Sequence, residues 1–260
     1  MPTSTPDALW ESSALGVLGP AAIACHGLYA SEHGHRLLNG IDLVIPVGAR
    51  VLLSSTETGA PGLLLRVLAG LALPASGFVS VAGVRESATG TADWARRLGY
   101  VGPRHGLPVW MTPAEVLDFA GQLADVADLE RERLVEAALG RYGLGTVRDR
   151  PLRRSGAAVA ERTALAAAML HEPEVVLLDE PLRSAEPAER ALRLRIGGQR
   201  RTVLLASLLP ASEEGLVDQL VLLDAGRVVL NAPISELEAR QLPLSLRGLE
   251  VLAADLGPLE

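Results

Sequence analysis

The chain contains no lysine, since all 24 of its basic side chains belong to arginine. A conventional P-loop, G-x-x-x-x-G-K-[ST], binds phosphate through a lysine, so no segment of this chain can supply one. Cys25 is the only cysteine, which excludes an internal disulfide and indicates a reducing compartment. No uninterrupted apolar stretch is long enough to cross a bilayer, so any role at a membrane would require a partner.

Positive charge is also scarce. The 31 acidic residues outnumber the basic ones, which gives a net charge of −7. No basic stripe with interleaved aromatic residues is present, and aromatic residues make up only 3% of the chain. These features argue against a nucleic-acid partner. At 260 residues the chain is long enough for one α/β domain with a sizeable core.

The most informative segment is the apolar run 175–178, which two carboxylates and a proline follow. Four consecutive apolar residues predict a short strand buried on both faces. Pro181 cannot continue the strand's hydrogen-bond ladder, so Asp179 and Glu180 should stand at its carboxyl end. Ligands of open α/β sheets bind at that edge. In nucleotide hydrolases an aspartate there holds Mg²⁺ and a following glutamate can orient water. A strand whose tip is simply acidic is the alternative.

Three segments resemble parts of the ATP-binding cassette (ABC) proteins. Residues 165–181, LAAAMLHEPEVVLLDEP, are similar to the Walker B strand and the segment before it. Residues 64–71, LLRVLAGL, resemble the helix after the P-loop, and residues 221–228, VLLDAGRV, resemble a late hairpin. They occur in family order and at family spacing, over about residues 22–232. The resemblance implies an α/β fold with a P-loop NTPase-like (RecA-like) core, an antiparallel β-subdomain and a helical subdomain.

The resemblance also divides the chain. Residues 21–232 would form the nucleotide-binding domain, with the helical subdomain at about 104–170. Residues 1–20 are small, polar and interrupted by prolines, and we expect them to form a loose leader. Residues 233–260 would be a C-terminal tail.

Apolar runs and turn residues predict the individual elements. Strands are expected at 23–29, 41–45, 51–53, 78–81, 98–101 and 202–207. Helices are expected at 63–71 and 160–170. Thr112 predicts the start of a further helical stretch that reaches Tyr142, because Pro113 follows at the first helical position and Glu115 can close a capping box.

Seven residues occupy the segment where the resemblance places a phosphate-binding loop: Ser55, Thr56, Thr58, Gly59, Ala60, Pro61 and Gly62. The four positions that define the motif fall at Ser55, Ala60, Pro61 and Gly62, and none carries the residue of the motif. Pro61 replaces the lysine and also removes a backbone N–H from the segment. Gly62 replaces the hydroxyl that would bind Mg²⁺. Thr56 and Thr58 offer hydroxyls that could substitute for it.

Three more positions of the family's nucleotide site carry other residue types. Pro103 stands where the family has a glutamine that senses the γ-phosphate, and Leu208 stands where it has a histidine that contacts this phosphate. The family's signature, L-S-G-G-Q, presents backbone donors at a helix N-terminus to the nucleotide of the opposite subunit. It aligns with residues 155–159, where Ser155 and Gly156 give the best match.

Asp179 and Glu180 are the parts of the site that the resemblance retains. Asp179 would bind Mg²⁺ if a nucleotide binds, and Glu180 would be the catalytic carboxylate or its vestige. A charge-assisted hydrogen bond contributes about 1.5–3 kcal/mol, and about 1.4 kcal/mol changes affinity tenfold. The joint loss of lysine, hydroxyl, glutamine and histidine therefore leaves little binding. We expect no bound cofactor, and ATP with Mg²⁺ if the site is functional.

Two hypotheses of function follow. The first is an ABC transporter ATP-binding subunit that is a degenerate pseudo-ATPase, a structural or regulatory cassette in a membrane transport complex. The second is an active or weakly active ABC ATPase that energises transport through a site rebuilt from threonines and arginines, with Arg50, Arg66 and Arg104 as the nearest basic residues. A non-transport ABC protein is a third hypothesis, which the absence of a coiled-coil insertion disfavours.

The resemblance also implies partners. ABC cassettes work as head-to-tail pairs, in which each site combines the P-loop of one subunit with the signature of the other. The expected partners are a transmembrane transporter subunit and a second, more intact ABC cassette. The chain would then lie in the cytoplasm, on the inner face of the membrane, held there through its partner.

Overall fold

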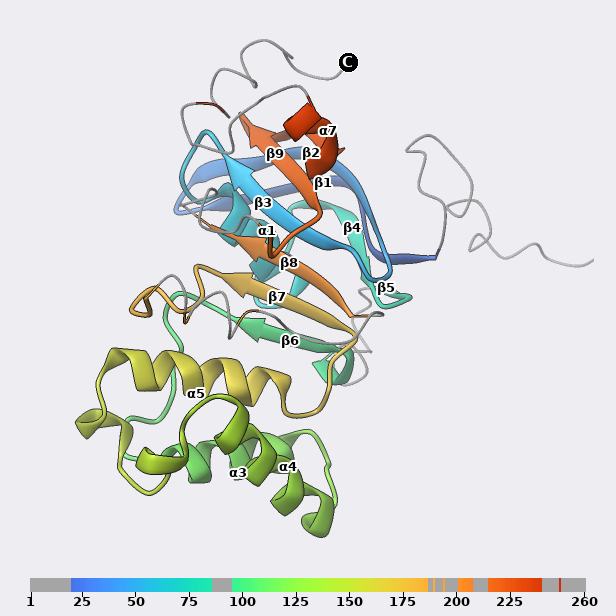
Figure 1. Ribbon diagram of the computed structural model, residues 1–260. Helices are drawn as coiled ribbons and strands as arrows, with labels where there is room; N and C mark the ends of the chain where they lie inside the picture. Colours follow the sequence, from blue (N-terminus) through green and yellow to red (C-terminus); the bar gives the residue numbers. More distant parts are fainter. Residues whose placement is uncertain are drawn as a thin grey trace, which may run out of the picture.

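The protein is described here from a computed structural model that covers residues 20–85, 95–186, 201–207 and 215–239, together with Glu189, Leu194 and Gly248. Two sheets and a group of helices make up this part of the chain (Figure 1). Three sequence predictions lie outside the described residues: the leader before Pro20, the role of Leu208, and nearly all of the tail after residue 239.

The larger sheet has six strands in the order β10-β9-β3-β8-β7-β6. Their bounds are β3 Arg50–Ser55, β6 Leu98–Val101, β7 Val175–Asp179, β8 Thr202–Ala206, β9 Gln219–Asp224 and β10 Arg227–Pro233. Every pair is parallel except β9 and β10. All residues of β7 and β8 are buried, as expected for a parallel sheet with both faces covered. The strands predicted at 51–53 and 175–178 are confirmed, and both run parallel to β8 in this one sheet.

The smaller sheet has four antiparallel strands in the order β2-β1-β4-β5. These are β1 Ala21–Glu32, β2 His35–Pro46, β4 Ser76–Val81 and β5 Val84–Arg85. The first two are longer than predicted because His33 and Gly34 join them directly, with φ of 50° and 82°. Two successive positive φ values suit the tight turn of a twisted hairpin. This sheet is the predicted antiparallel β-subdomain.

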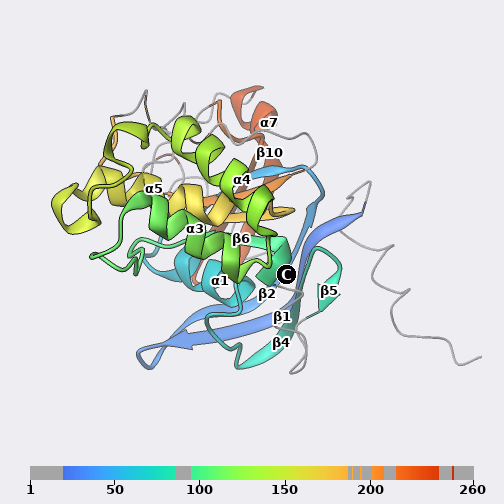
Figure 2. The same ribbon diagram turned by 90° about the horizontal axis from the view of Figure 1, so that it is seen from below.

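The four longest helices of the described residues form two groups (Figure 2). Helix α1, Ala60–Leu68, lies between the two sheets, while α3 Pro113–Leu123, α4 Asp128–Arg141 and α5 Ala157–Met169 form the helical subdomain. Two short 3-10 turns, η2 Gly145–Val147 and η3 Leu152–Arg154, connect α4 to α5. Within the described residues, no helix is long and apolar enough to cross a membrane.

Several helix boundaries differ from the predictions for identifiable reasons. Helices α1 and α5 each begin three residues early, directly after Gly59 and Gly156, whose φ values of 98° and 82° suit glycine. The predicted stretch from Thr112 to Tyr142 is two helices, because the chain turns after α3 at Asp125, where φ is 58°.

Strand β7 separates two cores by the alternation of its side chains. Val175 and Leu177 pack with α1 and the smaller sheet, whereas Val176 and Leu178 pack with α5 and the helical subdomain. Asp179 continues the first series and therefore faces α1. After β10, helix α7 Ile234–Ala239 packs Ile234 and Leu237 against the far side of the larger sheet.

Thr112→Ala should destabilise the helical subdomain. The Thr112 hydroxyl accepts a hydrogen bond from Glu115 N at 3.2 Å, and Thr112 N donates to the Glu115 carboxylate at 2.8 Å. Loss of this N-cap should lower the free energy of unfolding by about 1 kcal/mol, measured by chemical denaturation. The exposed Thr146 provides the control, and equal effects of Thr112→Ala and Thr146→Ala would contradict the prediction.

Candidate functional site

The candidate site lies where β7 ends opposite the first turn of α1. Strand β3 ends at Ser55, and residues 56–59 lead from it into α1. Asp179 is the last residue of β7 and faces this turn. The carboxyl ends of β3 and β7 meet at one edge of the sheet because both strands run parallel to β8.

Pro61 is accommodated without distortion. Ala60, Pro61 and Gly62 are the first three residues of α1 rather than part of a loop. An N–H group in the first turn of a helix has no intrahelical acceptor, so proline is tolerated there. The consequence is chemical: position 61 has neither a basic side chain nor a backbone donor to offer an anion.

The segment before α1 is hydrogen-bonded to the hairpin that β9 and β10 form. Thr56 N donates to Leu223 O at 3.2 Å, and the Thr56 hydroxyl donates to an Asp224 carboxylate oxygen at 2.5 Å. The Ser55 hydroxyl accepts a hydrogen bond from Glu57 N at 3.1 Å. Thr58 is exposed. The Thr56 hydroxyl, which the sequence offered as a substitute ligand for Mg²⁺, is therefore already committed to Asp224.

Gly62 directly faces Asp179. A Cβ atom added to Gly62 would lie 2.9 Å from Asp179 Oδ2 and 3.4 Å from Arg66 Nη1. A distance under 3.0 Å is too short for an undisturbed contact, so any side chain at position 62 forces its neighbours to move. A side chain at position 62 would therefore stand directly against a carboxylate and a guanidinium of the chain itself.

Arg66 links this carboxylate to the smaller sheet. Its Nη2 donates to both carboxylate oxygens of Glu32 at 2.7 Å, and its Nη1 lies 4.0 Å from Asp179 Oδ2. The Asp179 side chain is only 9% exposed. Unit charges 4 Å apart attract by about 4 kcal/mol at an effective dielectric constant of about 20. This attraction is of the same order as the several kcal/mol that burial of an ion costs.

Burial determines how the neighbouring acids titrate. Desolvation raises the pKa of Asp179 above its usual value, while the charges of Arg66 and Arg183 act in the opposite direction. Desolvation, assisted by the charge of Asp179, raises the pKa of Tyr100 to about 12. Tyr100 lies on β6 and packs with the core that contains α1.

Glu32, Gly62, Arg66, Tyr100 and Asp179 form one cluster, and no described contact joins the remaining predicted residues to its side chains, although Glu180 directly follows Asp179 in the chain. Gly156 caps α5, and the Ser155 hydroxyl donates locally to Arg150 O and Pro151 O at 3.3 and 3.0 Å. Pro103 is exposed in the segment after β6. Glu180 has a φ of 50°, and its N–H donates to Ala206 O at 3.0 Å.

The arginines of the second hypothesis do not converge. Arg50 is the first residue of β3, at the opposite end of the strand from Ser55, and its side chain donates to Leu216 O at 2.6 Å and Leu194 O at 3.2 Å. Arg104 is exposed after β6. Of the three, Arg66 alone reaches the described cluster.

Sequence reasoning missed two members of the cluster, Glu32 and Tyr100. Glu32 ends β1, and no local pattern indicates that a helix 34 residues later supplies its partner. Tyr100 carried a usable signal, because it alternates with Leu98 on the face of β6 toward α1. The described residues contain no group of three or more His, Cys, Asp or Glu side chains placed to hold a metal ion.

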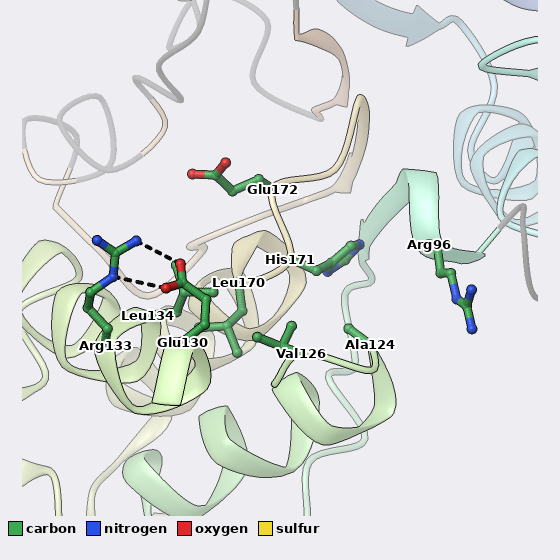
Figure 3. Close-up of a pocket in the computed structure, with 9 residues that line it drawn as sticks. All are labelled: Arg96, Ala124, Val126, Glu130, Arg133, Leu134, Leu170, His171 and Glu172. Carbon is green, nitrogen blue, oxygen red and sulfur yellow. Dashed lines mark hydrogen bonds and ion pairs between the residues drawn. The ribbon is translucent and has the colours of Figure 1, made fainter. Parts of the chain in front are cut away.

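A cavity of about 390 Å³ lies elsewhere, among α3, α4 and the end of α5 (Figure 3). Its apolar floor includes Leu134 and Leu170, and the charged groups of Arg133 and Glu130 at its rim are hydrogen-bonded to each other at 2.7 and 3.1 Å. The His171 ring contacts Leu98 O at 3.2 Å, at the amino end of β6. The cavity is therefore at the opposite edge of the sheet from Asp179.

Comparison with known proteins adds a family to this geometry. A sequence model described as "ABC transporter" matches residues 59–183. The nickel import ATP-binding protein NikO of Rhodobacter capsulatus is 31% identical, over 84% of this chain and 92% of that protein. The cytochrome c biogenesis ATP-binding export protein CcmA of Cupriavidus necator is 34% identical, over 82% of this chain and 96% of that protein.

Solved structures show the same fold. An ATP-binding subunit of an ABC transporter superposes with a TM-score of 0.78 and 24% identity, covering 90% of this chain and 99% of that chain. The ATP-binding cassette MJ0796, a dimer bound to ADP and phosphate, superposes with a TM-score of 0.73 and 14% identity, over 82% of this chain and 98% of that chain. The predicted P-loop α/β architecture with its two subdomains is confirmed.

Gly62→Ala should destabilise the protein although alanine favours helix. The added Cβ would crowd the ends of the Asp179 and Arg66 side chains, which can shift, so the cost should lie at the lower end of the range of about 1–3 kcal/mol for overpacking. Gly140→Ala in α4 is the matched control, because nothing lies within 4 Å of the added atom; it should stabilise by about 0.4–1 kcal/mol. Chemical denaturation measures both, and a stabilising Gly62→Ala would contradict the described contact.

Tyr100 should make the protein sensitive to alkali. Its pKa is raised from 10.0 to about 12, so its contribution to stability is complete below pH 10 and is lost as pH rises through about 12. The free energy of unfolding should fall across this window, and Tyr100→Phe should remove part of that fall. Denaturation at a series of pH values tests this, and an identical fall in the variant would contradict it.

Proposed function

The chain belongs to the ABC transporter family as an ATP-binding subunit, and from that membership we propose that it is a pseudo-ATPase, a cassette that acts by occupying its place in a transport complex. It retains the scaffold of the family together with Asp179 and Glu180, and it lacks the lysine, the hydroxyl and the glutamine of the family's nucleotide site. The cassette extends over about residues 21–232, with its helical subdomain at about 104–170.

One observation carries the proposal: the first turn of α1 faces the chain's own charged groups. ABC ATPases bind ATP with Mg²⁺. Here Pro61 has no donor, Gly62 has no hydroxyl, and the space beside Gly62 holds the Asp179 carboxylate and the Arg66 guanidinium. These residues fit Mg²⁺ and a chain of phosphates poorly, because the Arg66 guanidinium lies beside the carboxylate that would bind the cation, and neither Pro61 nor Gly62 has a side chain that could bind phosphate or Mg²⁺.

The hydrogen bonds around the site support the same proposal. The Thr56 hydroxyl donates to Asp224, and Pro103 has neither a side chain that could coordinate a metal nor a backbone N–H that could donate a hydrogen bond. The signature positions offer Ser155 and Gly156 but no glutamine. Several independent positions depart together, which favours a change of role over a single compensated loss.

The active ATPase is the second candidate, because Asp179 and Glu180 keep their places at the end of β7. On that hypothesis Glu180 would be the catalytic carboxylate and Glu180→Gln would abolish turnover. On the hypothesis proposed here, the same substitution has no turnover to remove.

ABC ATPase subunits pair with transmembrane subunits and dimerise. Because each nucleotide site of such a dimer combines the P-loop of one cassette with the signature of the other, we expect a heteromer. In a homodimer both sites would combine the segment from Ser55 to Gly62 with Ser155 and Gly156, and neither could clamp a nucleotide. With an intact cassette as partner, the partner's P-loop could still bind ATP. We therefore propose a heteromeric complex on the cytoplasmic face of a membrane, in which any ATP turnover belongs to the other cassette.

The transported substrate should be set by the membrane subunit. The relatives include a protein named for nickel import and one named for cytochrome c biogenesis export. Cassettes of similar sequence are thus named for different cargoes and for opposite directions of transport. The cavity among α3, α4 and α5 lies at the sheet edge opposite Asp179.

The purified protein should bind Mg·ATP negligibly and hydrolyse none. Isothermal titration calorimetry and a phosphate-release assay measure these two properties. Pro61→Lys with Gly62→Ser should not restore hydrolysis, since position 103 remains proline and the new serine meets Asp179 at 2.9 Å. Saturable ATP binding in the micromolar range, or turnover lost on Glu180→Gln, would establish the active ATPase instead.

The partner prediction is tested by co-expression. Affinity purification in gentle detergent, with candidate membrane subunits and intact cassettes present, should recover a complex that contains both. ATP turnover of that complex should be lost when the partner's catalytic glutamate is changed, and should persist in Glu180→Gln. Recovery of the chain alone, without a membrane subunit or a second cassette, would contradict the proposal.

A further inference from the structure

Arg66 differs from its neighbours on α1. Leu63, Leu64, Leu65, Val67 and Leu68 are all buried, at 0–2% exposure, in the core between the two sheets. The Arg66 side chain is 27% exposed and follows Gly62 by four residues. Residues four apart lie on one face of a helix, so the guanidinium points to the side on which Gly62 meets Asp179.

The two carboxylates that Arg66 contacts come from different sheets. Glu32 is the last residue of β1 in the smaller sheet, and Asp179 is the last residue of β7 in the larger sheet. Nη2 of Arg66 is bound by both oxygens of Glu32 at 2.7 Å, while Nη1 is directed to Asp179 Oδ2 at 4.0 Å. One side chain thus spans the junction between the sheets.

An ordinary surface ion pair is more exposed to water and joins residues of a single element. Arg133 and Glu130 illustrate that type, since they are an i, i+3 pair on α4 with side chains 77% and 46% exposed. Such pairs contribute little because water screens them. Arg66, Glu32 and Asp179 are 27%, 34% and 9% exposed and belong to three different elements, so their interaction is screened less and connects parts of the fold.

The absence of a side chain at position 62 is a second, independent observation. An added Cβ atom there would lie 2.9 Å from Asp179 Oδ2 and 3.4 Å from Arg66 Nη1. Glycine therefore leaves the room that the carboxylate and the guanidinium take up.

We propose that Arg66 is the resident counter-ion of this site: its guanidinium, held by Glu32, occupies the cation position beside Asp179 and ties the smaller sheet to the carboxyl edge of the larger one. The inference deepens the pseudo-ATPase proposal, on which it rests. It means that the junction between the sheets is complete without a metal ion or a nucleotide, so the cassette presents one fixed surface to its partners.

The proposal makes a specific statement about divalent cations. With Arg66 in place, one positive charge lies between the two carboxylates, and the charge of Arg183 also acts on Asp179. Without it, only the charge of Arg183 is described as opposing that of Asp179, and Glu32 and Asp179 offer oxygen ligands of the kind that hard divalent cations prefer. A variant that lacks the guanidinium should therefore gain sensitivity to Mg²⁺ or Mn²⁺ that the intact protein lacks.

Thermal unfolding of the full chain, without nucleotide, provides the test. Arg66→Met keeps much of the side-chain stem and should lower the Tm by about 5 °C. Arg133→Met, the control on an exposed pair, should change it by less than about 2 °C. Adding Asp179→Asn to Arg66→Met removes the unpaired buried charge and should recover most of the loss.

Mn²⁺ then reports on the cation position. The Tm of the intact protein should be unaffected by millimolar Mn²⁺, whereas that of Arg66→Ala should rise, with stoichiometric Mn²⁺ seen by electron paramagnetic resonance. Arg66→Ala with Asp179→Asn should lose this binding. Stoichiometric Mn²⁺ binding to the intact protein would overturn the proposal, as would an Arg66→Met variant as stable as the Arg133→Met control.

The test remains decisive if the single variants do not fold. In that case the double variant with Asp179→Asn should fold, and failure of both would overturn the proposal. Because no nucleotide is used, these results are separate from the ATP titration. ATP binding by the intact chain would refute the pseudo-ATPase alone, and a Tm indifferent to Arg66 would refute the counter-ion alone.

Discussion

The structure depends on how the carboxylate of Asp179 is neutralised. A fully buried parallel strand ends at this residue, and the alternation of its side chains turns Asp179 toward α1. A buried carboxylate needs an opposite charge or hydrogen-bond donors. The chain supplies Arg66 at 4.0 Å and leaves room for the pair by having no side chain at Gly62. The residues that crowd the first turn of α1 are thus the ones that stabilise the end of β7.

This constraint is compatible with our proposal that the scaffold persists while the nucleotide site has lost its activity. Helix α1 packs leucines against both sheets, and the fold needs that packing whatever the first turn contains. Pro61 is acceptable there because the first turn lacks intrahelical acceptors for its N–H groups. Glu32, Arg66 and Asp179 then join the two sheets. A cassette with such internal contacts can keep its partner surfaces without a ligand at the sheet edge.

The sequence predicted the architecture well because long apolar runs and a capping box are local signals. Strand 175–178 and the start of α3 at Thr112 are examples. Helix limits at Gly59 and Gly156 were less predictable, because they depend on backbone conformations that glycine permits but does not require. The pairing of Arg66 with Glu32 joins residues 34 positions apart, and only tertiary contacts between β1 and α1 determine it.

The central claim, that the first turn of α1 is closed to Mg·ATP, is tested most directly at Gly62 itself. Two-dimensional nuclear magnetic resonance of the isotopically labelled protein can follow the backbone amides of Gly62 and Leu63 during addition of millimolar Mg·ATP. The account predicts that neither resonance moves beyond the change caused by Mg²⁺ and salt alone. A saturable shift of the Gly62 amide would show that phosphate reaches this turn and would contradict the account.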